Sequence, residues 1–179
     1  MNPSATAASP SSAHATTPDQ LAAAWEALRS EHPSVRTREA ARRLGVSEME
    51  LLATGCDSTV RRLRSDVNDL LPRLEALGEV MALTRNDLFV HEKTGVYENP
   101  GLGTHASQIV GEDIDLRIFP ASWKHAFAAE VAGRRGPLHS LQFFDAHGVA
   151  VHKIYRTENS DREAWEALVD ELVVEDQSR

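Results

Sequence analysis

The feature that most constrains this fold is a change in hydrophobic spacing at Gly78. Before Gly78, apolar residues such as Leu21, Trp25 and Leu28 recur at the spacing of one face of an α-helix. After Gly78, apolar residues fall in short runs separated by turn-forming residues, which is typical of β-strands. The sequence therefore predicts a helical first part followed by a sheet.

Residues 18–77 read as a series of helices. The first follows Pro18, and the second covers residues 37–44 and ends at Gly45. A short third helix begins after Ser47, where the Ser-x-x-Glu pattern forms a capping box. The fourth contains Pro72, which we expect in its first turns or at a kink. Its apolar face is formed by Val67, Leu70, Leu71, Leu74 and Leu77.

The second part is predicted to be an antiparallel sheet with one inserted helix. We expect that helix around residues 123–131, because Trp123, Phe127 and Val131 recur at helical intervals. A C-terminal helix is expected after a second capping box that starts at Ser160. The expected strands cover residues 80–83, 88–91, 113–119, 138–145 and 149–156. In the third of these, Ile114, Leu116 and Ile118 alternate with Asp115, Arg117 and Phe119, which predicts a strand buried on one face. N-terminal helices, an antiparallel sheet with an inserted helix and a C-terminal helix make an α+β fold.

Length and composition limit the domain organisation. A chain of 179 residues suffices for one domain with a substantial core. We expect this domain to cover residues 18–175. Residues 1–17 are rich in Ala, Ser, Thr and Pro and lack both a basic start and an apolar segment, so they are predicted to be a disordered tail.

Charge and cysteine content limit the partners and the compartment. The net charge of −8 disfavours nucleic acid as a partner. The lone Cys56 excludes an internal disulfide framework and fits a reducing, cytoplasmic environment. No apolar run approaches the roughly 18–20 residues of a membrane span, so we expect no membrane insertion.

The motifs of the common catalytic classes are missing from the sequence. It has no His-Glu-x-x-His metalloprotease motif, no Cys-x-x-Cys pair, no nucleophile elbow and no phosphate-binding P-loop. The notable pattern is instead His105 in a glycine-rich loop, followed twelve residues later by Arg117 on a predicted strand. A histidine can ligate iron and an arginine can hold a carboxylate. Haem presents one metal and two propionates, so this pair suits haem.

A second group of residues suggests a different function. Residues 35–52 resemble the first two helices of a helix-turn-helix, with Gly45 at the turn and Ser47 as the cap. Glu48 and Glu50 would then face DNA phosphates, which repel carboxylates. A DNA-binding regulator is therefore an alternative, and a helical packing unit is the favoured interpretation.

The wider sequence from Leu21 to Val173 resembles the first repeat of the HemS/ChuS-type haemin-degrading factors, and it is also similar to the single-repeat haem carriers of the ChuX/HutX type. No single segment is specific, but together they follow the family's order along the chain. The segments that carry the resemblance are Arg85-Asn86-Asp87-Leu88-Phe89-Val90-His91-Glu92, Gly103-Thr104-His105-Ala106, Asp115-Leu116-Arg117-Ile118-Phe119, Trp123, Leu141-Gln142-Phe143-Phe144-Asp145 with Gly148, and Lys153-Ile154-Tyr155 before Asn159-Ser160-Asp161.

The resemblance implies a cytoplasmic bacterial protein that binds haem during iron acquisition. Arg117 matches the family arginine that reaches haem from the first repeat, and His105 matches a histidine proposed to contact haem. His91 matches a family histidine without an assigned role. We expect His105 to be the metal ligand, with His91, Tyr97 and Tyr155 as alternatives. Arg117 would pair with a propionate or donate to a ligand on the iron.

The sequence also departs from the longer family members. Their principal axial histidine lies in the second repeat after an Asp-Val pair, and here the matching pattern is Asp66-Val67-Asn68, in which Asn68 is a poor iron ligand. The chain also contains one repeat. We therefore expect a homodimer or an open haem cleft. The missing axial histidine favours a haem carrier or store over a haem-degrading enzyme, with a haem-uptake transporter or a downstream haem-degrading protein as a partner.

Overall fold

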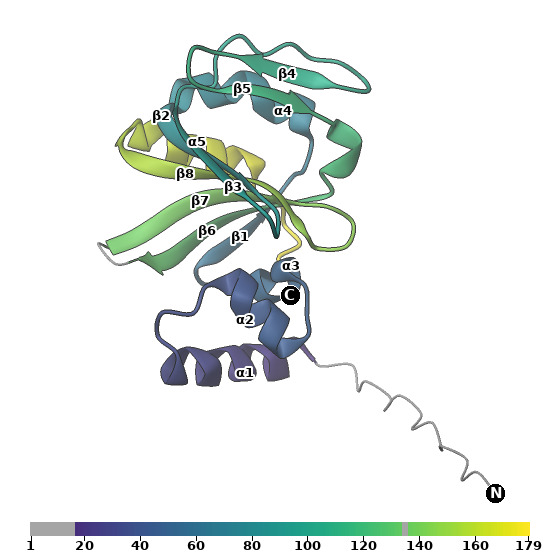
Figure 1. Cartoon of the computed structure of the whole chain (residues 1–179), viewed down its shortest axis with the longest axis vertical. Coiled ribbons are helices and arrows are strands. Elements are labelled where there is room, and N and C mark those ends of the chain that lie inside the picture. The colour runs from purple at the N-terminus through teal and green to yellow at the C-terminus, as the bar shows by residue number, and fades with distance from the viewer. Residues whose placement is uncertain (1–16, 134–135) are drawn as a thin grey trace, which may run out of the picture.

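The computed structural model describes residues 17–133 and 136–179. Six antiparallel strands form the central sheet (Figure 1), in the order β1-β6-β7-β8-β2-β3. The predicted α+β class is confirmed. The predicted tail lies outside the described residues, apart from Thr17, which caps the first helix. The strands of the sheet are β1 (Val60–Leu63), β2 (Gly78–Arg85), β3 (Val90–Gly95), β6 (His125–Gly133), β7 (Gly136–Phe144) and β8 (Ala150–Ser160).

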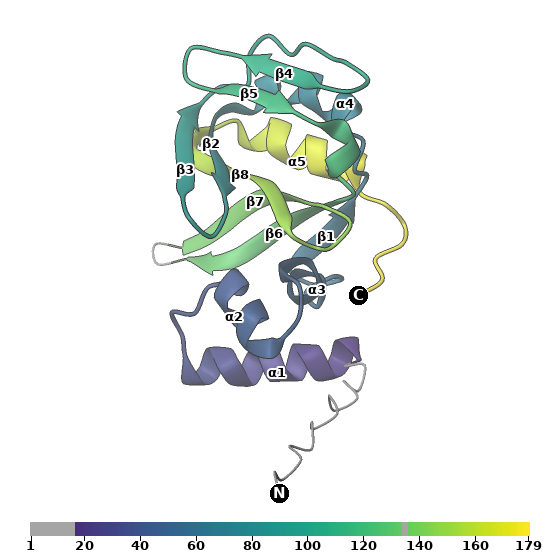
Figure 2. The same ribbon diagram turned by 45° about the vertical axis from the view of Figure 1, so that its right-hand side comes forward.

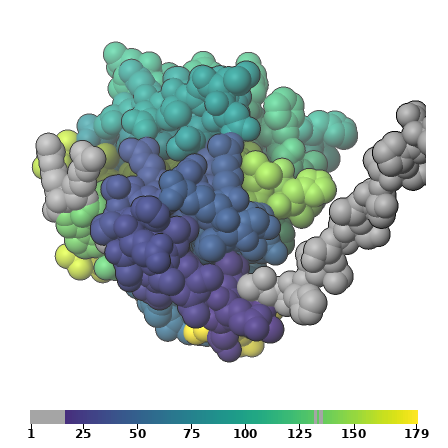
Figure 3. All heavy atoms as spheres, turned by 60° about the horizontal axis from the view of Figure 1, so that its bottom comes forward, coloured from purple at the N-terminus to yellow at the C-terminus, as the bar shows by residue number. Residues whose placement is uncertain are grey.

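Three helices form a layer at the N-terminal end of the molecule: α1 (Pro18–Glu31), α2 (Thr37–Leu44) and α3 (Glu48–Ala53). Their atoms form one continuous mass when the molecule is viewed from that end (Figure 3). Gly45 adopts a left-handed φ of 70° and ends α2, as predicted. Ser47 and Glu50 form the predicted capping box, with Glu50 N donating to Ser47 Oγ over 3.1 Å.

The packing of α3 bears on the DNA-binding alternative. Leu51, Leu52 and Ala53 are buried, and Glu48 is paired with Lys153 of β8. The helix that would have to read DNA is therefore packed between α2 and the sheet, and its exposed residue, Glu50, is a carboxylate that DNA phosphates repel. This arrangement agrees with the packing-unit interpretation.

The fourth predicted helix is shorter than expected and is divided. Its α-helical part is α4 (Val67–Leu70), and a 3₁₀-helix, η1 (Leu71–Leu77), follows. Pro72 lies in the first turn of η1, as the kink prediction required. The preceding strand β1 was not predicted, because its few residues pair with β6 through contacts that are distant in sequence.

The predicted helix at residues 123–131 is wrong, because this segment forms strand β6. Both faces of β6 are buried: Phe127 and Ala129 pack on the side of α3, whereas Ala126 and Ala128 pack on the other side. A strand buried on both faces does not alternate in polarity. The spacing of Trp123, Phe127 and Val131 therefore matched a helix by coincidence.

A separate two-stranded sheet lies at the opposite end of the molecule from α1 (Figures 1 and 2), formed by β4 (Ser107–Val110) and β5 (Asp115–Ile118). The only helical turn between β5 and β6 is the short 3₁₀-helix η2 (Pro120–Ser122). The alternation predicted for residues 113–119 is confirmed, since Ile114 and Ile118 are buried and Asp115, Arg117 and Phe119 are exposed.

The C-terminal helix α5 (Arg162–Leu172) covers the same face of the sheet as η1. Its cap is Asp161, whose side chain accepts a hydrogen bond from Ala164 N over 2.9 Å. The predicted cap, Ser160, instead bonds to the backbone carbonyl of Glu79. Among the described helices, none has the length and apolar character needed to cross a bilayer.

Candidate functional site

The outward side of the β4–β5 sheet gathers the features expected of a site for a flat apolar ligand. Alternation along the two strands turns Ile109 and Ile118 into the core and leaves Gln108 and Arg117 outside. Gln108 lies opposite Arg117 in the strand register, and Gly101 bridges to Gln108 on its other side. We call this surface, together with the loop of residues 101–106, the outer β4–β5 face.

Apolar side chains on this face are unusually exposed. Leu102 is 51% exposed, Val110 is 43% exposed and Phe119 is 58% exposed. Groups of large exposed apolar residues commonly mark places where another molecule binds. The sequence predicted that Phe119 points outward, but the grouping of the three depends on the β4–β5 pairing and was missed.

Arg117 provides a positive charge at the centre of the face. It is exposed, and its guanidinium donates a hydrogen bond to the amide oxygen of Gln108. Within the described ranges, Arg117 forms no ion pair with a carboxylate. The guanidinium therefore retains donors for the carboxylate of a ligand, although the exposed Asp115 lies two residues away on the same side of β5.

His105 is exposed in the loop that precedes β4. Ser107, two residues later, pairs with Ile118, so the loop lies at the end of the ladder where β5 continues into Phe119. His105 and Arg117 therefore belong to the same small sheet and its adjoining loop. The structure therefore places these two predicted site residues in neighbouring parts of the same small unit.

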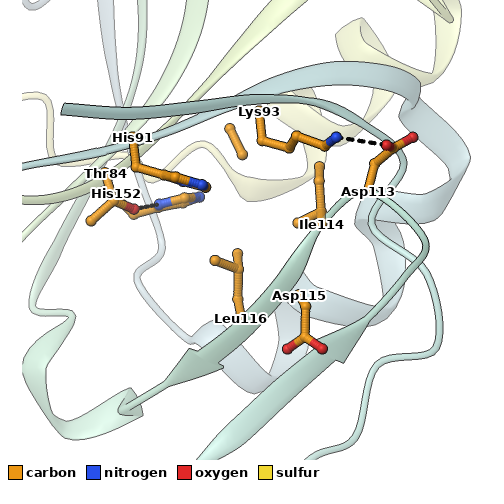
Figure 4. A pocket seen from close by; sticks show the side chains of 9 residues that line it. Thr84, His91, Lys93, Asp113, Ile114, Asp115, Leu116 and His152 are labelled. Carbon is orange, nitrogen blue, oxygen red and sulfur yellow. Dashed lines mark hydrogen bonds and ion pairs between the residues drawn. The ribbon is translucent and has the colours of Figure 1, made fainter.

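His91 lies elsewhere, in a cleft between β2–β3 and the inward side of β5 (Figure 4). The cleft has a volume of about 220 Å³, below the roughly 300–1,000 Å³ of typical small-molecule pockets. Across it, Lys93 Nζ and Asp113 Oδ1 form an ion pair of 2.8 Å. The cleft is too small to enclose a porphyrin, so His91 does not share a haem-sized cavity with the other candidates.

Tyr97 is buried in the core behind this cleft. It is 1% exposed, and its hydroxyl lies 2.6 Å from Nε2 of His152. The Thr84 hydroxyl lies 2.8 Å from the other ring nitrogen of His152. Burial raises the pKa of Tyr97, and burial followed by the nearby His91 lowers the pKa of His152 to about 4. Tyr97 is thus part of an internal network and does not reach the outer β4–β5 face.

Tyr155 lies on the opposite side of the central sheet. Alternation along β8 places it on the side that faces α3, together with Lys153, whereas Ile154 points to the other side. Burial, assisted by the negative charge of Glu48, raises the pKa of Tyr155 to about 12. The structure therefore separates Tyr155 from His105 and Arg117.

The described residues contain no group of three or more His, Cys, Asp or Glu side chains that could hold a metal ion. A porphyrin supplies four ring nitrogens and needs only an axial donor from the protein, which a single histidine provides. The outer β4–β5 face carries an exposed imidazole, an exposed guanidinium and exposed apolar side chains.

The chain is similar in sequence and in structure to proteins that are described as transporting or binding haem. Over 147 residues, the chain is 44% identical to the hemin transport protein HmuS of Yersinia pestis, an alignment that covers 82% of this chain and 43% of that protein. The structure resembles holo-PhuS, a heme-binding protein from Pseudomonas aeruginosa, with a TM-score of 0.86 and 44% identity over 90% of this chain and 47% of that one.

A third relative has a different described activity. The heme degrading enzyme ChuS of Escherichia coli O157:H7 superposes with a TM-score of 0.86 and 30% identity, covering 91% of this chain and 49% of that one. The chain thus spans about half the length of these relatives. Residues 45–172 match the haemin-degrading HemS/ChuX domain. The chain therefore belongs to the HemS/ChuX family.

Proposed function

We propose that this protein binds haem on the outer β4–β5 face and carries or stores it. The observation that supports this most directly is the combination of Arg117, which has no ion pair among the described residues, an exposed His105 and exposed apolar side chains on one small sheet and its loop. HmuS is described as a hemin transport protein and PhuS as a heme-binding protein, which supports the same ligand.

Each group on the face would have a distinct task. His105 would supply the axial nitrogen to the iron, because an exposed imidazole can approach the metal without displacing core contacts. Arg117 would hold a propionate through charge-assisted hydrogen bonds, exchanging its bond with Gln108 for a stronger one. Leu102, Val110 and Phe119 would cover part of the apolar ring.

The face is open on its outward side, so a bound haem would keep its second side exposed. A second copy of the chain would cover that side, which is why we propose a homodimer as the haem-loaded form. An exposed second side would also allow haem to pass between this protein and a partner, such as an uptake transporter or a haem-degrading protein. We propose that this transfer takes place in the cytoplasm.

Haem degradation is the second candidate, because ChuS is described as a heme degrading enzyme. Oxidative opening of the ring needs oxygen and electrons, and the haem itself supplies the reactivity. A site that leaves one side of the ring open gives little exclusion of water, which favours carriage over controlled degradation.

A haemin titration followed by absorption spectroscopy and solution mass tests these proposals together. We expect a saturable Soret band and a mass of twice the protomer plus haem. Addition of ascorbate to the complex then separates the two candidates, since a carrier keeps the Soret band and a degrading enzyme loses it. A spectrum equal to that of free haemin at all protein concentrations would contradict haem binding.

A further inference from the structure

The loop that carries His105 has few backbone contacts of its own. At its start, Gly101 and Gln108 exchange two backbone hydrogen bonds of 2.9 and 2.8 Å. For residues 102–106, the described part of the chain provides no other backbone-to-backbone hydrogen bond. These bonds close the loop but leave its interior without backbone restraints, and such a segment would sample many conformations and give its histidine no fixed position.

Side chains supply the missing restraints at Gly103. The backbone nitrogen of Gly103 donates to Ser107 Oγ over 3.1 Å, and its carbonyl oxygen accepts from Asn68 Nδ2 over 3.3 Å. Ser107 Oγ in turn donates to Asn68 Oδ1 over 2.7 Å. Both backbone polar groups of Gly103 are therefore held by side chains that also bind each other. We call Asn68, Gly103 and Ser107 the latch.

The latch is itself attached to rigid parts of the core. Ser107 is 1% exposed and pairs with Ile118. Asn68 lies in α4, where Asp66 Oδ1 accepts a hydrogen bond from Asn68 N over 3.0 Å and caps the helix. Val67, the neighbouring residue, is 3% exposed in the main core. The loop is thus tied to a capped, buried helix that is distant in sequence.

The turn made by the loop is also too tight for a side chain at Gly103. A Cβ atom at this position would lie 2.3 Å from the carbonyl oxygen of Ala106, which is well inside van der Waals contact. The backbone therefore folds back on itself over three residues, and His105 lies within that turn. The tight turn and the latch therefore both restrict the conformation of the loop that carries His105.

We propose that Asn68 and Ser107 are positioning residues that order the His105 loop and so prepare the imidazole to bind its ligand. This inference rests on the proposed haem function for the identity of the ligand, but the ordering of the loop does not depend on haem. A loop ordered before binding avoids the entropic cost of ordering it afterwards, and this raises affinity. Asn68 then contributes without contacting the iron.

The test uses Asn68→Ala and Ser107→Ala in the full chain, with Ser140→Ala as the matched control. Ser140 is also 1% exposed, but it lies in β7 of the central sheet and its hydroxyl bonds to Ala129. In the protein without haem, hydrogen exchange of the Gly103 amide, which donates to Ser107 Oγ, should accelerate about tenfold in the two latch variants and stay unchanged in the control. Unchanged exchange in both latch variants would overturn the proposal.

Haemin titrations of the same variants provide the second measurement. Both latch variants should bind haemin about tenfold more weakly than wild type, with a broadened Soret band, and Ser140→Ala should bind normally. In a His105→Ala background, Asn68→Ala should weaken binding less than about twofold further, because the latch acts through His105. Fully additive losses would overturn the positioning role. If wild type binds no haemin, the proposed function fails, whereas the exchange measurement still decides whether the latch orders the loop.

Discussion

The Tyr97 hydroxyl lies 2.6 Å from Nε2 of His152, and both residues are buried. This contact joins the segment after β3 to β8 in the middle of the sheet. Thr84 satisfies the other ring nitrogen at 2.8 Å, so the neutral imidazole has a partner for its one donor and its one acceptor. Trp123 packs against the His152 ring with centroids 5.7 Å apart. The network therefore fixes the core beneath the β4–β5 sheet.

Replacing Tyr97 should show how much its hydrogen bond to His152 contributes to stability. Tyr97→Phe keeps the ring but leaves Nε2 of His152 without a partner, so we expect a loss of about 2 kcal/mol in the free energy of unfolding. Urea denaturation measures this loss. Tyr155→Phe is the matched control, and it should change stability by less than about 0.5 kcal/mol. Equal effects of the two changes would mean that the bond to His152 contributes no net stability.

His152 should make stability depend on pH. Its pKa is lowered from 6.5 to about 4 in the folded protein, so the unfolded chain binds the proton more tightly. The contribution of His152 is therefore fully present above about pH 6.5 and is lost as the pH falls toward 4, by about 3 kcal/mol in all. Urea denaturation of wild type and His152→Phe at several pH values measures the pH-dependent contribution of His152 to stability. Parallel pH profiles for the two proteins would contradict it.

The ion pair between Glu48 and Lys153 joins α3 to the sheet, and both side chains are only 9% exposed. Lys153→Met should therefore cost about 3 kcal/mol of stability, because it leaves the Glu48 carboxylate buried without its partner. Adding Glu48→Leu should recover most of this loss, since the buried charge is then removed as well. If the double variant is no more stable than the single one, the unpaired Glu48 carboxylate does not account for the loss.

Arg117 should affect ligand binding more than folding. Arg117→Ala is expected to weaken haemin binding about tenfold, because it removes charge-assisted hydrogen bonds to a propionate. Stability should change little, because the side chain is exposed. Arg162→Ala, which removes an exposed arginine of α5, is the control and should leave the titration unchanged. Superimposable titrations for wild type and Arg117→Ala would show that Arg117 does not contact haem.

His105 should determine the spectrum of the complex. His105→Ala is expected to shift the Soret maximum, because a different axial donor changes the electronic structure of the iron. His147, which is exposed in the turn between β7 and β8, provides the control, and His147→Ala should give the wild-type spectrum. An unshifted Soret band for His105→Ala would point to another axial ligand, and His91 is then the next residue to replace.

Several features of the fold could be predicted because their signals are local. The capping box at Ser47 and the alternation from Ile114 to Ile118 appear in the structure as the sequence indicates. In each case a few neighbouring residues determine the backbone conformation. Strand β6 could not be predicted in the same way, because its burial on both faces is imposed by elements far away in the chain.

The candidate site was likewise predictable only in part from the sequence. The sequence alone determined which residue types are available, including the His105 and Arg117 pair, and it identified the family through the order of its segments. Tertiary structure decided that these two lie in one small sheet and its adjoining loop, that Tyr97 is held inside the core by His152, and that Tyr155 lies on the far side of the sheet. The physical reason is that strand pairing and packing join residues distant in sequence. A local pattern fixes which way a side chain points from its strand, but only the packed layers decide whether that direction leads to solvent or to the core.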